Sequence, residues 1–152
     1  MKLRTATDAD SQDIWEWKND PLTREMSRDP TPVPRDAHDR WFAAVQQDEN
    51  RVIFVAVDTQ TGEKIGMVRF DADPASGTAE TSINLNPAMR GRGLATPLLR
   101  HAVDHYAQAS DSVLRAEVKS ANTASIRVFG NAGFEECRED RGIKTFRRAI
   151  KK

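Results

Sequence analysis

The sequence has only one cysteine, Cys137, among its 152 residues. A single thiol excludes an internal disulfide framework and a cysteine-rich metal site, and it fits a reducing cytoplasm. The sequence also lacks any run near the roughly 20 apolar residues that a membrane-spanning helix needs. Its start lacks the apolar stretch of a signal peptide, because Asp8 and Asp10 follow the first few residues. We therefore predict a cytoplasmic protein with no membrane partner.

An excess of charge of either sign is absent as well. Lysine plus arginine and aspartate plus glutamate number 23 each, so the formal net charge is +0. No overall field attracts nucleic acid, and we predict no nucleic-acid partner, although a local basic pocket is compatible with this balance. Internal repeats and low-complexity linkers are lacking too. The chain is long enough for one buried core, and residues 1–152 are predicted to form a single domain.

Hydrophobic periodicity divides the chain into helices and strands. Helical spacing predicts helices from residue 8 or 10 to the breaker at 19–21, at 22–27 as a short turn, and at 35–47, 93–108 and 122–132. Strands are predicted at 3–7, 52–57, 65–70, 78–85, 113–118, 134–137 and 143–150. Segment 29–34 contains three prolines, which exclude a regular helix.

The order of these elements is β-α-α-βββ-α-β-α-ββ. The three strands between residues 52 and 85 are joined by turns, which predicts an antiparallel meander. Strands and helices otherwise alternate, so we predict an α/β fold in which helices flank a central sheet. The sheet is expected to be mixed, mostly antiparallel, and to contain about seven strands.

The segment 83–95 carries the clearest chemical signal. Pro87 ends a strand because it cannot donate to the ladder, and Gly91 and Gly93 let the backbone turn sharply before a helix begins. Free N–H groups and the positive end of the helix dipole then face one spot, which is suited to a phosphate or pyrophosphate. Arg90 and Arg92 add positive charge. The plainer interpretation is a strand-to-helix turn with two solvated arginines.

Two motifs in this sequence resemble those of a known family. The pattern Arg90-x-x-Gly93-x-Ala95 matches the Arg/Gln-x-x-Gly-x-Gly/Ala signature of the GCN5-related N-acetyltransferase (GNAT) superfamily. Segment 122–134, with Asn, Ser, Phe and Gly-Phe at fixed spacing, is similar to a later motif of that family. The order of elements is similar too, so the resemblance covers essentially the whole chain. It implies acetyl-CoA as co-substrate, no metal, and a primary amine as acceptor.

The resemblance also implies where acetyl-CoA binds. The family separates two central strands, here the strand ending at Leu85 and the strand 113–118, and the pantetheine arm pairs with the exposed backbone of the first. An N–H group near Leu85 would polarise the thioester carbonyl. The implied acetyl-CoA contacts are Ile83, Asn84, Leu85, Arg90, Gly91, Arg92, Gly93, Leu94, Ala95, Asn122, Ser125 and Phe129.

Proton transfer is less well specified by the sequence. Phe129 stands where many relatives carry a tyrosine that protonates the leaving thiolate, and the only tyrosine, Tyr106, falls on the core face of its helix. A water molecule would then return that proton. Glu80 is the candidate catalytic base because it lies on the strand leading to Leu85, although a cross-strand surface charge is the alternative. His38 is a weaker candidate base.

Two further histidines, His101 and His105, lie one helical turn apart and imitate a metal pair. No third ligand accompanies them in the sequence, so we predict no metal site.

The acceptor side is expected to come from the N-terminal helices. Segment 15–24 resembles a Trp-x-Asn-Asp-Pro-x-x-Arg motif that is typical of ribosomal-protein acetyltransferases and of acetyltransferases for amino-sugar nucleotides. The second branch includes the enzyme that acetylates a UDP-linked 4-amino sugar in pseudaminic acid synthesis, and the sequence resembles it more. Predicted substrate-binding residues are Trp17, Asn19, Arg24, Trp41 and Arg69. The alternatives are that the tryptophans are core residues and that Asn19 only stops a helix.

Three functions therefore stay open at this point. The first is acetylation of a small-molecule amine, with an amino-sugar nucleotide favoured. The second is acetylation of a protein amine, at an N-terminus or a lysine. The third is an acyl-CoA-binding domain without turnover. A homodimer is compatible with the sequence, which does not fix the oligomeric state.

Overall fold

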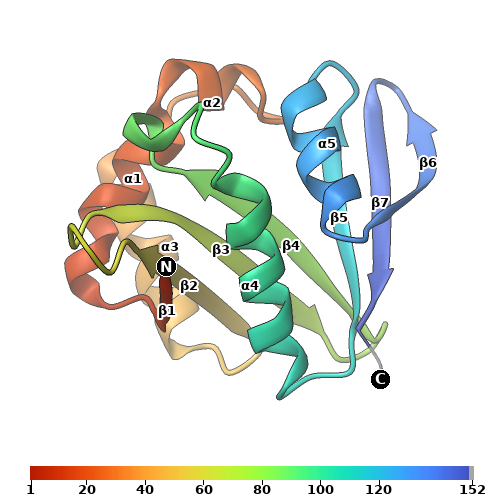
Figure 1. The fold of residues 1–152 in the computed structure, drawn as a ribbon, viewed down its shortest axis with the longest axis horizontal. Helices are drawn as coiled ribbons and strands as arrows, with labels where there is room; N and C mark the ends of the chain where they lie inside the picture. The colour runs from red at the N-terminus through yellow and green to blue at the C-terminus, as the bar shows by residue number, and fades with distance from the viewer. Residues whose placement is uncertain (151–152) are drawn as a thin grey trace.

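A seven-stranded sheet with the strand order β1-β2-β3-β4-β5-β7-β6 forms the centre of the molecule (Figure 1). The computed structural model describes residues 1–150. Its strands are β1 (Lys2–Thr5), β2 (Arg51–Val57), β3 (Lys64–Asp73), β4 (Thr78–Leu85), β5 (Val113–Lys119), β6 (Glu135–Asp140) and β7 (Ile143–Ala149). Its helices are α1 (Ser11–Asn19), α2 (Pro21–Glu25), α3 (Arg35–Gln47), α4 (Ala95–Ala107) and α5 (Thr123–Asn131), with short 3-10 turns η1 (Asp8–Asp10) and η2 (Pro87–Met89).

Strand directions confirm the predicted mixed sheet. Strands β1 to β4 pair antiparallel in sequence order, as the predicted meander requires. Strand β5 pairs parallel with β4, while β7 pairs antiparallel with both β5 and β6. The α/β class with seven strands is therefore confirmed. No helix within residues 1–150 has the length and apolarity that crossing a bilayer requires.

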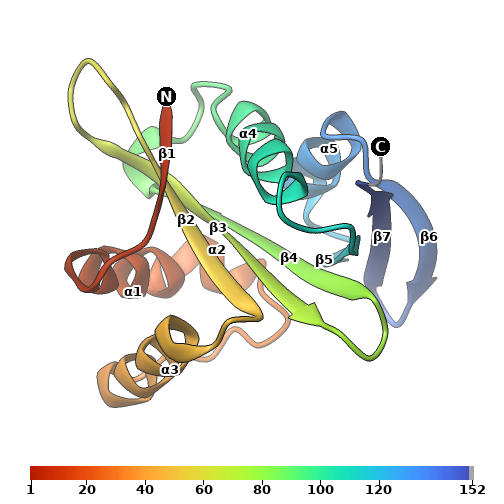
Figure 2. The same cartoon turned by 90° about the horizontal axis from the view of Figure 1, so that it is seen from below.

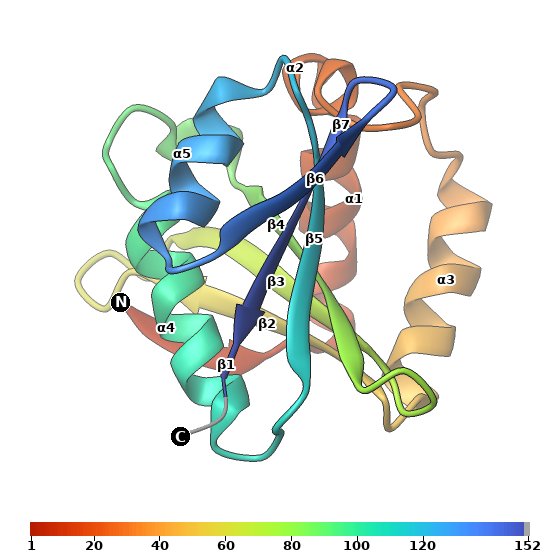
Figure 3. The same cartoon turned by 90° about the vertical axis from the view of Figure 1, so that its right-hand side faces the viewer.

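Helices cover both faces of the sheet, as Figures 2 and 3 show from two sides: α1 and α3 lie on one face, α4 and α5 on the other. Alternate side chains of each strand point to opposite faces, so each central strand contributes to two cores. In β2, for example, Phe54 and Ala56 join the core under α4, whereas Ile53 and Val55 join the core under α1 and α3. This explains the continuous apolar run in the sequence of β2.

Differences from the predicted boundaries have local causes. Helix α4 begins at Ala95 rather than at residue 93, because Gly93 has a φ of 68° and is outside helical geometry. Helix α1 begins at Ser11, after the 3-10 turn of η1. Strand β6 extends to Asp140, although all six of its side chains are exposed. Its charged residues protect this edge of the sheet against pairing with another chain.

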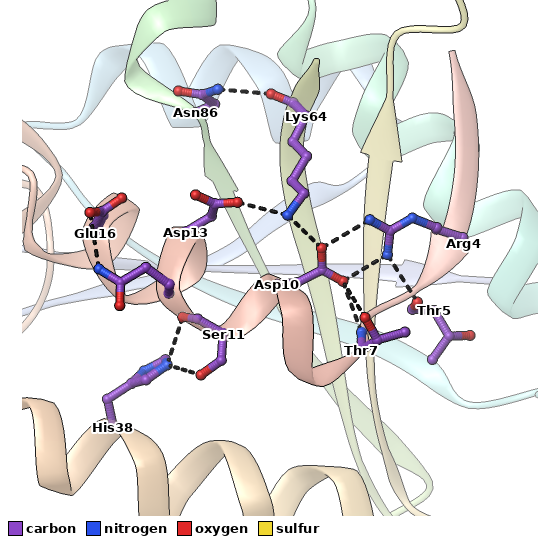
Figure 4. Close-up of polar contacts among 11 residues, drawn as sticks. Arg4, Thr5, Thr7, Asp10, Ser11, Asp13, Glu16, His38, Lys64 and Asn86 are labelled. Atoms are coloured by element: carbon purple, nitrogen blue, oxygen red, sulfur yellow. Dashed lines mark hydrogen bonds and ion pairs between the residues drawn. The ribbon is translucent and has the colours of Figure 1, made fainter. Parts of the chain in front are cut away.

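A buried carboxylate, Asp10, ties the first strand to the sheet (Figure 4). Its side chain is 0% exposed, and both oxygens accept hydrogen bonds from Arg4, at 2.7 and 2.9 Å. The ammonium of Lys64 lies 2.8 Å from one oxygen, and the backbone N–H of Thr7 donates to the other at 2.8 Å. This group therefore joins β1, η1 and β3 through charge-assisted bonds.

A buried histidine, His38, holds α3 against α1. Its ring is 0% exposed, and Nε2 lies 3.0 Å from the hydroxyl oxygen and 3.0 Å from the carbonyl oxygen of Ser11 (Figure 4). Its Nδ1 has no hydrogen-bond partner within residues 1–150. Burial lowers the pKa of His38, and the charge of Lys18 lowers it further. His38 is thus a neutral packing residue, which corrects its assignment as a candidate base.

Acidification is expected to destabilise the fold through His38. The pKa of this ring is lower in the folded state than in the unfolded chain, so below about pH 6.5 the unfolded chain takes up a proton that the folded state refuses. Stability should then fall with decreasing pH, by at most about 1.4 kcal/mol per pH unit for one proton. Urea unfolding at pH 7.5 and 5.5 measures this loss. The variant His38→Gln should show a smaller pH dependence, and an equal dependence in both proteins would contradict the prediction.

Candidate active site

Strands β4 and β5 separate partway along their length. They pair only where residues 78–80 of β4 face residues 113–115 of β5. Beyond this point β4 continues to Leu85 and β5 to Lys119, each still paired on its outer side but, within residues 1–150, not with each other. Figure 1 shows the two strands diverging towards α2 and α5. The backbone of residues 83–85 therefore has a free edge, as the resemblance implies for the strand that binds pantetheine.

The loop from Arg90 to Leu94 has the geometry of an anion site. Gly91 and Gly93 have φ values of 76° and 68°, a conformation that favours glycine. The backbone N–H groups of residues 91–94 donate to no acceptor among the residues that the structure describes. Helix α4 starts directly afterwards, so its positive end adds to these free donors. The residues present therefore fit the predicted pyrophosphate contact.

The two arginines of this loop differ in their surroundings. Arg90 forms an ion pair with Asp20, and its Nη2 donates to the hydroxyl of Thr23 at 3.0 Å. Asp20 also caps α2 by accepting from the N–H of Thr23, and the hydrogen bond from Arg90 lowers the pKa of this carboxyl. Arg92, by contrast, is exposed. Arg92 and the loop N–H groups are thus available to a phosphate, whereas Arg90 must first leave Asp20.

Residues 20–28, which contain α2, lie across the open end between the separated strands (Figure 3). Arg90, which follows β4, holds one end of this segment through Asp20. On the β5 side, Lys119 donates to the carbonyl oxygen of Glu25 at 3.0 Å, and Arg28 pairs with Glu117. The segment is therefore fastened to both sides of the gap. It limits how large a molecule can approach from that end.

Glu80 lies where the two strands part, since it is the last residue of β4 that pairs with β5. Its neighbours in sequence, Ala79 and Thr81, are buried, so alternation directs Glu80 towards the face of α1 and α3. There it forms an ion pair with Arg115, while 41% of its side-chain surface stays exposed. Burial raises the pKa of Glu80, and Arg115 opposes this shift. A carboxylate of this kind is suited to accept a proton.

Arg115 and Glu117 were not identified from the sequence. Arg115 contacts Glu80 and also donates to Glu117 at 3.2 Å, and Glu117 in turn pairs with Arg28. Glu80, Arg115, Glu117 and Arg28 thus form a row of side chains of alternating charge, which runs from β4 along β5 to the connection between α2 and α3. The sequence pattern that could have identified them is the alternation of residues in the strand 113–119. It places Arg115 and Glu117 on the face opposite to the buried residues of that strand.

Three of the predicted acetyl-CoA contacts have structural partners in this protein. The ring of Phe129 is 3% exposed and packs on the rings of Phe134 and Phe146, with centroids 5.0 and 6.1 Å away. Asn122 caps α5 by accepting from the N–H of Ser125 at 3.1 Å, and its amide donates to the Ser125 hydroxyl at 3.0 Å. Their roles toward acetyl-CoA stay predictions. Phe129 offers no hydroxyl to the leaving thiolate.

The predicted acceptor residues divide into two groups, and the first is structural. Trp17 is 5% exposed and belongs to the core under α1 and α3. Asn19 hydrogen-bonds the backbone of Val33 in both directions, at 2.7 and 3.1 Å. Arg24 donates to the carbonyl oxygens of Asn19 and Pro30. These three residues shape α1 and the proline-rich loop, and their role toward the acceptor stays a prediction.

The second group, Trp41 and Arg69, lies on the side of the sheet that α1 and α3 cover, the side to which Glu80 points. Trp41 lies half-buried on α3, and the guanidinium carbon of Arg69 is 5.1 Å from its ring centre. Lys18, which was not identified from the sequence, lies over the same ring at 3.4 Å. Arg69 also donates to the hydroxyl of Ser82 on β4 at 3.4 Å, two residues from Glu80. These side chains therefore lie close to the point where the strands part.

The remaining aromatic and histidine residues take no part in this site. Tyr106 stacks on Phe70 with centroids 4.2 Å apart, which agrees with its predicted place in the core. His101 is exposed, and His105 contacts the edge of Phe54. Within residues 1–150, no group of three or more histidine, cysteine, aspartate or glutamate side chains is arranged to hold a metal ion.

A cleft of about 740 Å³ lies beside α1 and the loop that follows β4. Its carboxylates outnumber its single lysine, so it suits an anionic ligand poorly. The lining residues are Asp13, Trp15, Glu16, Trp17, Asn19, Asp20, Glu63, Lys64, Asn86, Pro87 and Ala88. Neither Glu80 nor the glycine loop contributes to it.

Known proteins share both the sequence pattern and this architecture. An L-methionine sulfoximine/L-methionine sulfone acetyltransferase of Salmonella typhimurium is 31% identical over 140 residues, covering 88% of this chain and 80% of that protein. A solved phosphinothricin N-acetyltransferase structure superposes with a TM-score of 0.83 and 26% identity, covering 99% of both chains. The acetyltransferase yncA from Salmonella typhimurium, solved with acetyl-CoA, has a TM-score of 0.81 at 24% identity, covering 100% of this chain and 95% of that one.

The family comparison agrees with these relatives. Residues 1–135 match the sequence family described as the Acetyltransferase (GNAT) domain. This range includes the separated strands, Glu80 and the glycine loop. The chain therefore belongs to the GNAT family of acetyl-CoA-dependent N-acetyltransferases.

Proposed function

We propose that this N-acetyltransferase acts on the primary amine of a small molecule, with Glu80 as the base. The proposal rests on the position of Glu80. Its side chain is half-exposed on the side of the sheet covered by α1 and α3, at the point where β4 and β5 separate. An amine on that face reaches a thioester held along the free edge of residues 83–85. The segment 20–28 across the open end favours a small acceptor over a protein chain.

The reaction is a direct transfer in a complex of enzyme, acetyl-CoA and amine. The amine nitrogen attacks the thioester carbonyl carbon, the new C–N bond forms, and the C–S bond breaks. Glu80 removes the proton that the amine loses, and a backbone N–H near Leu85 stabilises the oxyanion. The thiolate of CoA takes a proton from water, because Phe129 has no hydroxyl to donate. Holding the two reactants together supplies much of the rate.

Two kinds of small acceptor are supported by different observations. The sequence around residues 15–24 resembles enzymes for a UDP-linked 4-amino sugar, which makes such a sugar nucleotide the first candidate. The names of the similar proteins point instead to amino-acid analogues: L-methionine sulfoximine and L-methionine sulfone in one name, and phosphinothricin, as a candidate substrate, in the other. Both candidates carry a primary amine on a compact scaffold.

Release of free CoA tests the proposal directly. The purified protein is incubated with acetyl-CoA and, in turn, L-methionine sulfoximine, a UDP-linked 4-amino sugar, an aminoglycoside and a peptide. We expect turnover with one of the first two and none with the peptide. Turnover with the peptide alone would replace the small molecule by a protein acceptor. Tight acetyl-CoA binding without release to any amine would overturn the proposal in favour of an acyl-CoA-binding domain.

A further inference from the structure

Three positive side chains lie near one another on the side of the sheet covered by α1 and α3. Lys18 from α1 and Arg69 from β3 lie over the Trp41 ring, and Arg51 from β2 shares the carboxylate of Asp71 with Arg69. We call these three residues, with Asp71, the cation cluster. Asp71 accepts from Arg51 at 3.1 Å and from Arg69 at 2.9 Å, and it is the carboxylate that pairs with these arginines. Three positive charges and one negative charge leave the cluster with two uncompensated positive charges.

Lys18 makes this imbalance most evident. Its ammonium forms no hydrogen bond or ion pair with any residue that the structure describes, and its nearest neighbour is the Trp41 ring, at 3.4 Å. Burial, together with the charges of Arg69 and Arg51, lowers the pKa of Lys18 to about 8. A half-buried ammonium without an anion is unfavourable. A negative group brought by a ligand would offset this unfavourable term.

The cation cluster is open to solvent and close to Glu80. The side chains of Arg51 and Arg69 are 26% and 23% exposed, so a ligand can reach them. Asp71 is the direct cross-strand partner of Glu80, which puts their Cα atoms roughly 5 Å apart. A small acceptor therefore spans from the cluster to Glu80 with an anionic group at one end and its amine at the other.

We propose that the cation cluster binds an anionic group of the acceptor, a carboxylate or a phosphate, through Lys18 and Arg69 beside the Trp41 ring. This inference rests on the proposed function and narrows its substrate class. An acceptor without negative charge gains nothing at the cluster, and a polyamine, which is only positive at neutral pH, is repelled by it. The two positive charges thus select the acceptor before the amine reaches Glu80.

Substrate pairs with and without the negative group test the inference. L-Methionine sulfoximine is compared with its carboxamide, and the UDP-linked 4-amino sugar with the free 4-amino sugar. We expect kcat/KM to be about tenfold to a hundredfold higher for the anionic member of the pair that is accepted. The pair that shows the difference in kcat/KM identifies the anionic group that the cluster binds, a carboxylate or a phosphate.

Variants assign the effect to the cluster. Lys18→Gln and Arg69→Gln should each lower kcat/KM for the anionic acceptor about tenfold more than for the neutral acceptor. Lys18→Arg keeps the charge and should preserve the preference. Arg138→Gln, on exposed β6, serves as the matched control. Equal kcat/KM for both members of each pair, or equal losses for both in the Gln variants, would overturn the inference although acetyl transfer itself stands.

A binding measurement keeps the inference testable if no amine is turned over. The NMR signal of the Trp41 indole is followed during titration with L-methionine sulfoximine and with the UDP-linked 4-amino sugar, in the presence of CoA. We expect a saturable shift with one of them in the wild-type protein and none in Lys18→Gln. A shift without turnover would contradict the proposed function but would leave the inference about the cation cluster standing. No shift with either compound would overturn the inference.

Discussion

Replacing Asp10 by alanine is expected to lower the free energy of unfolding by about 3 kcal/mol, the lower end of the range for breaking a buried ion pair. The variant leaves the charges of Arg4 and Lys64 without their shared partner and the N–H of Thr7 without its acceptor. The lower end applies because Arg4 and Lys64 are partly hydrated, with 38% and 24% of their side chains exposed. Urea unfolding at pH 7 measures the loss.

The neighbouring carboxylate Asp13 provides a matched control. It contacts the same ammonium of Lys64 at 2.7 Å, but 39% of its side chain is exposed. Asp13→Ala should therefore cost less than about 1 kcal/mol, as surface pairs do. If Asp13→Ala and Asp10→Ala lower stability equally, burial is not what makes Asp10 important.

The pH dependence of this contribution has a definite sign. Burial alone would raise the pKa of Asp10, but hydrogen bonds from Arg4, Lys64 and the Thr7 N–H outweigh it and hold the pKa well below its usual range. A depressed folded-state pKa adds stability above the unfolded pKa of about 4, and this stability is lost only as the pH falls through the folded value. The difference in unfolding free energy between wild type and Asp10→Asn should thus stay constant from pH 8 to pH 5. Both proteins contain His38, so the loss of stability that His38 causes in this range does not change the difference.

The geometry of the glycine loop could be predicted from the sequence, because its determinants are local. Gly91 and Gly93 lie in the short connection between the end of β4 at Leu85 and the start of α4 at Ala95. Their positive φ values follow from the need to turn between the two elements. Periodicity and Pro87 place the boundaries of β4 and bring the start of α4 within two residues of its observed position.

The acceptor side was predicted less well, because its side chains act over long sequence separations. Asn19 was predicted to bind the acceptor, and its partner in the structure is the backbone of Val33, 14 residues away. Arg24 likewise reaches the carbonyl oxygen of Pro30 across the proline-rich loop. No local pattern distinguishes a polar residue that fixes a loop from one that binds a ligand.

Lys18 and Arg115 show the converse failure. Both looked like ordinary charged residues in the sequence, one on a helix face and the other in a strand. Their significance arises from pairing across elements: Lys18 lies over a ring of α3, and Arg115 faces Glu80 on the adjacent strand. The parallel pairing of β4 with β5, which creates the second contact, depends on a crossover through α4 that fixes register only in the folded chain.

Replacing Glu80 by glutamine is expected to lower kcat/KM by about a hundredfold to ten-thousandfold, the range for losing a general base. Glutamine keeps the size of the side chain and still accepts from Arg115, so acetyl-CoA binding should be unchanged. A base works only when deprotonated, so the wild-type rate should fall as the pH drops through the pKa of Glu80, which burial raises. The acidic limb of the pH profile should thus lie above the ordinary glutamate range and vanish in Glu80→Gln.

Glu117→Gln separates this role from a general effect of charge around Arg115. Glu117 is the other carboxylate on the same guanidinium, and it is comparably accessible, with 26% of its side chain exposed. The substitution makes the same chemical change one strand away, so it should retain most of the activity and the acidic limb. If both variants lose activity equally, the Arg115 ion pairs are structural and Glu80 is not the base. If Glu80→Gln keeps its rate within about threefold, the amine arrives already deprotonated and needs no base.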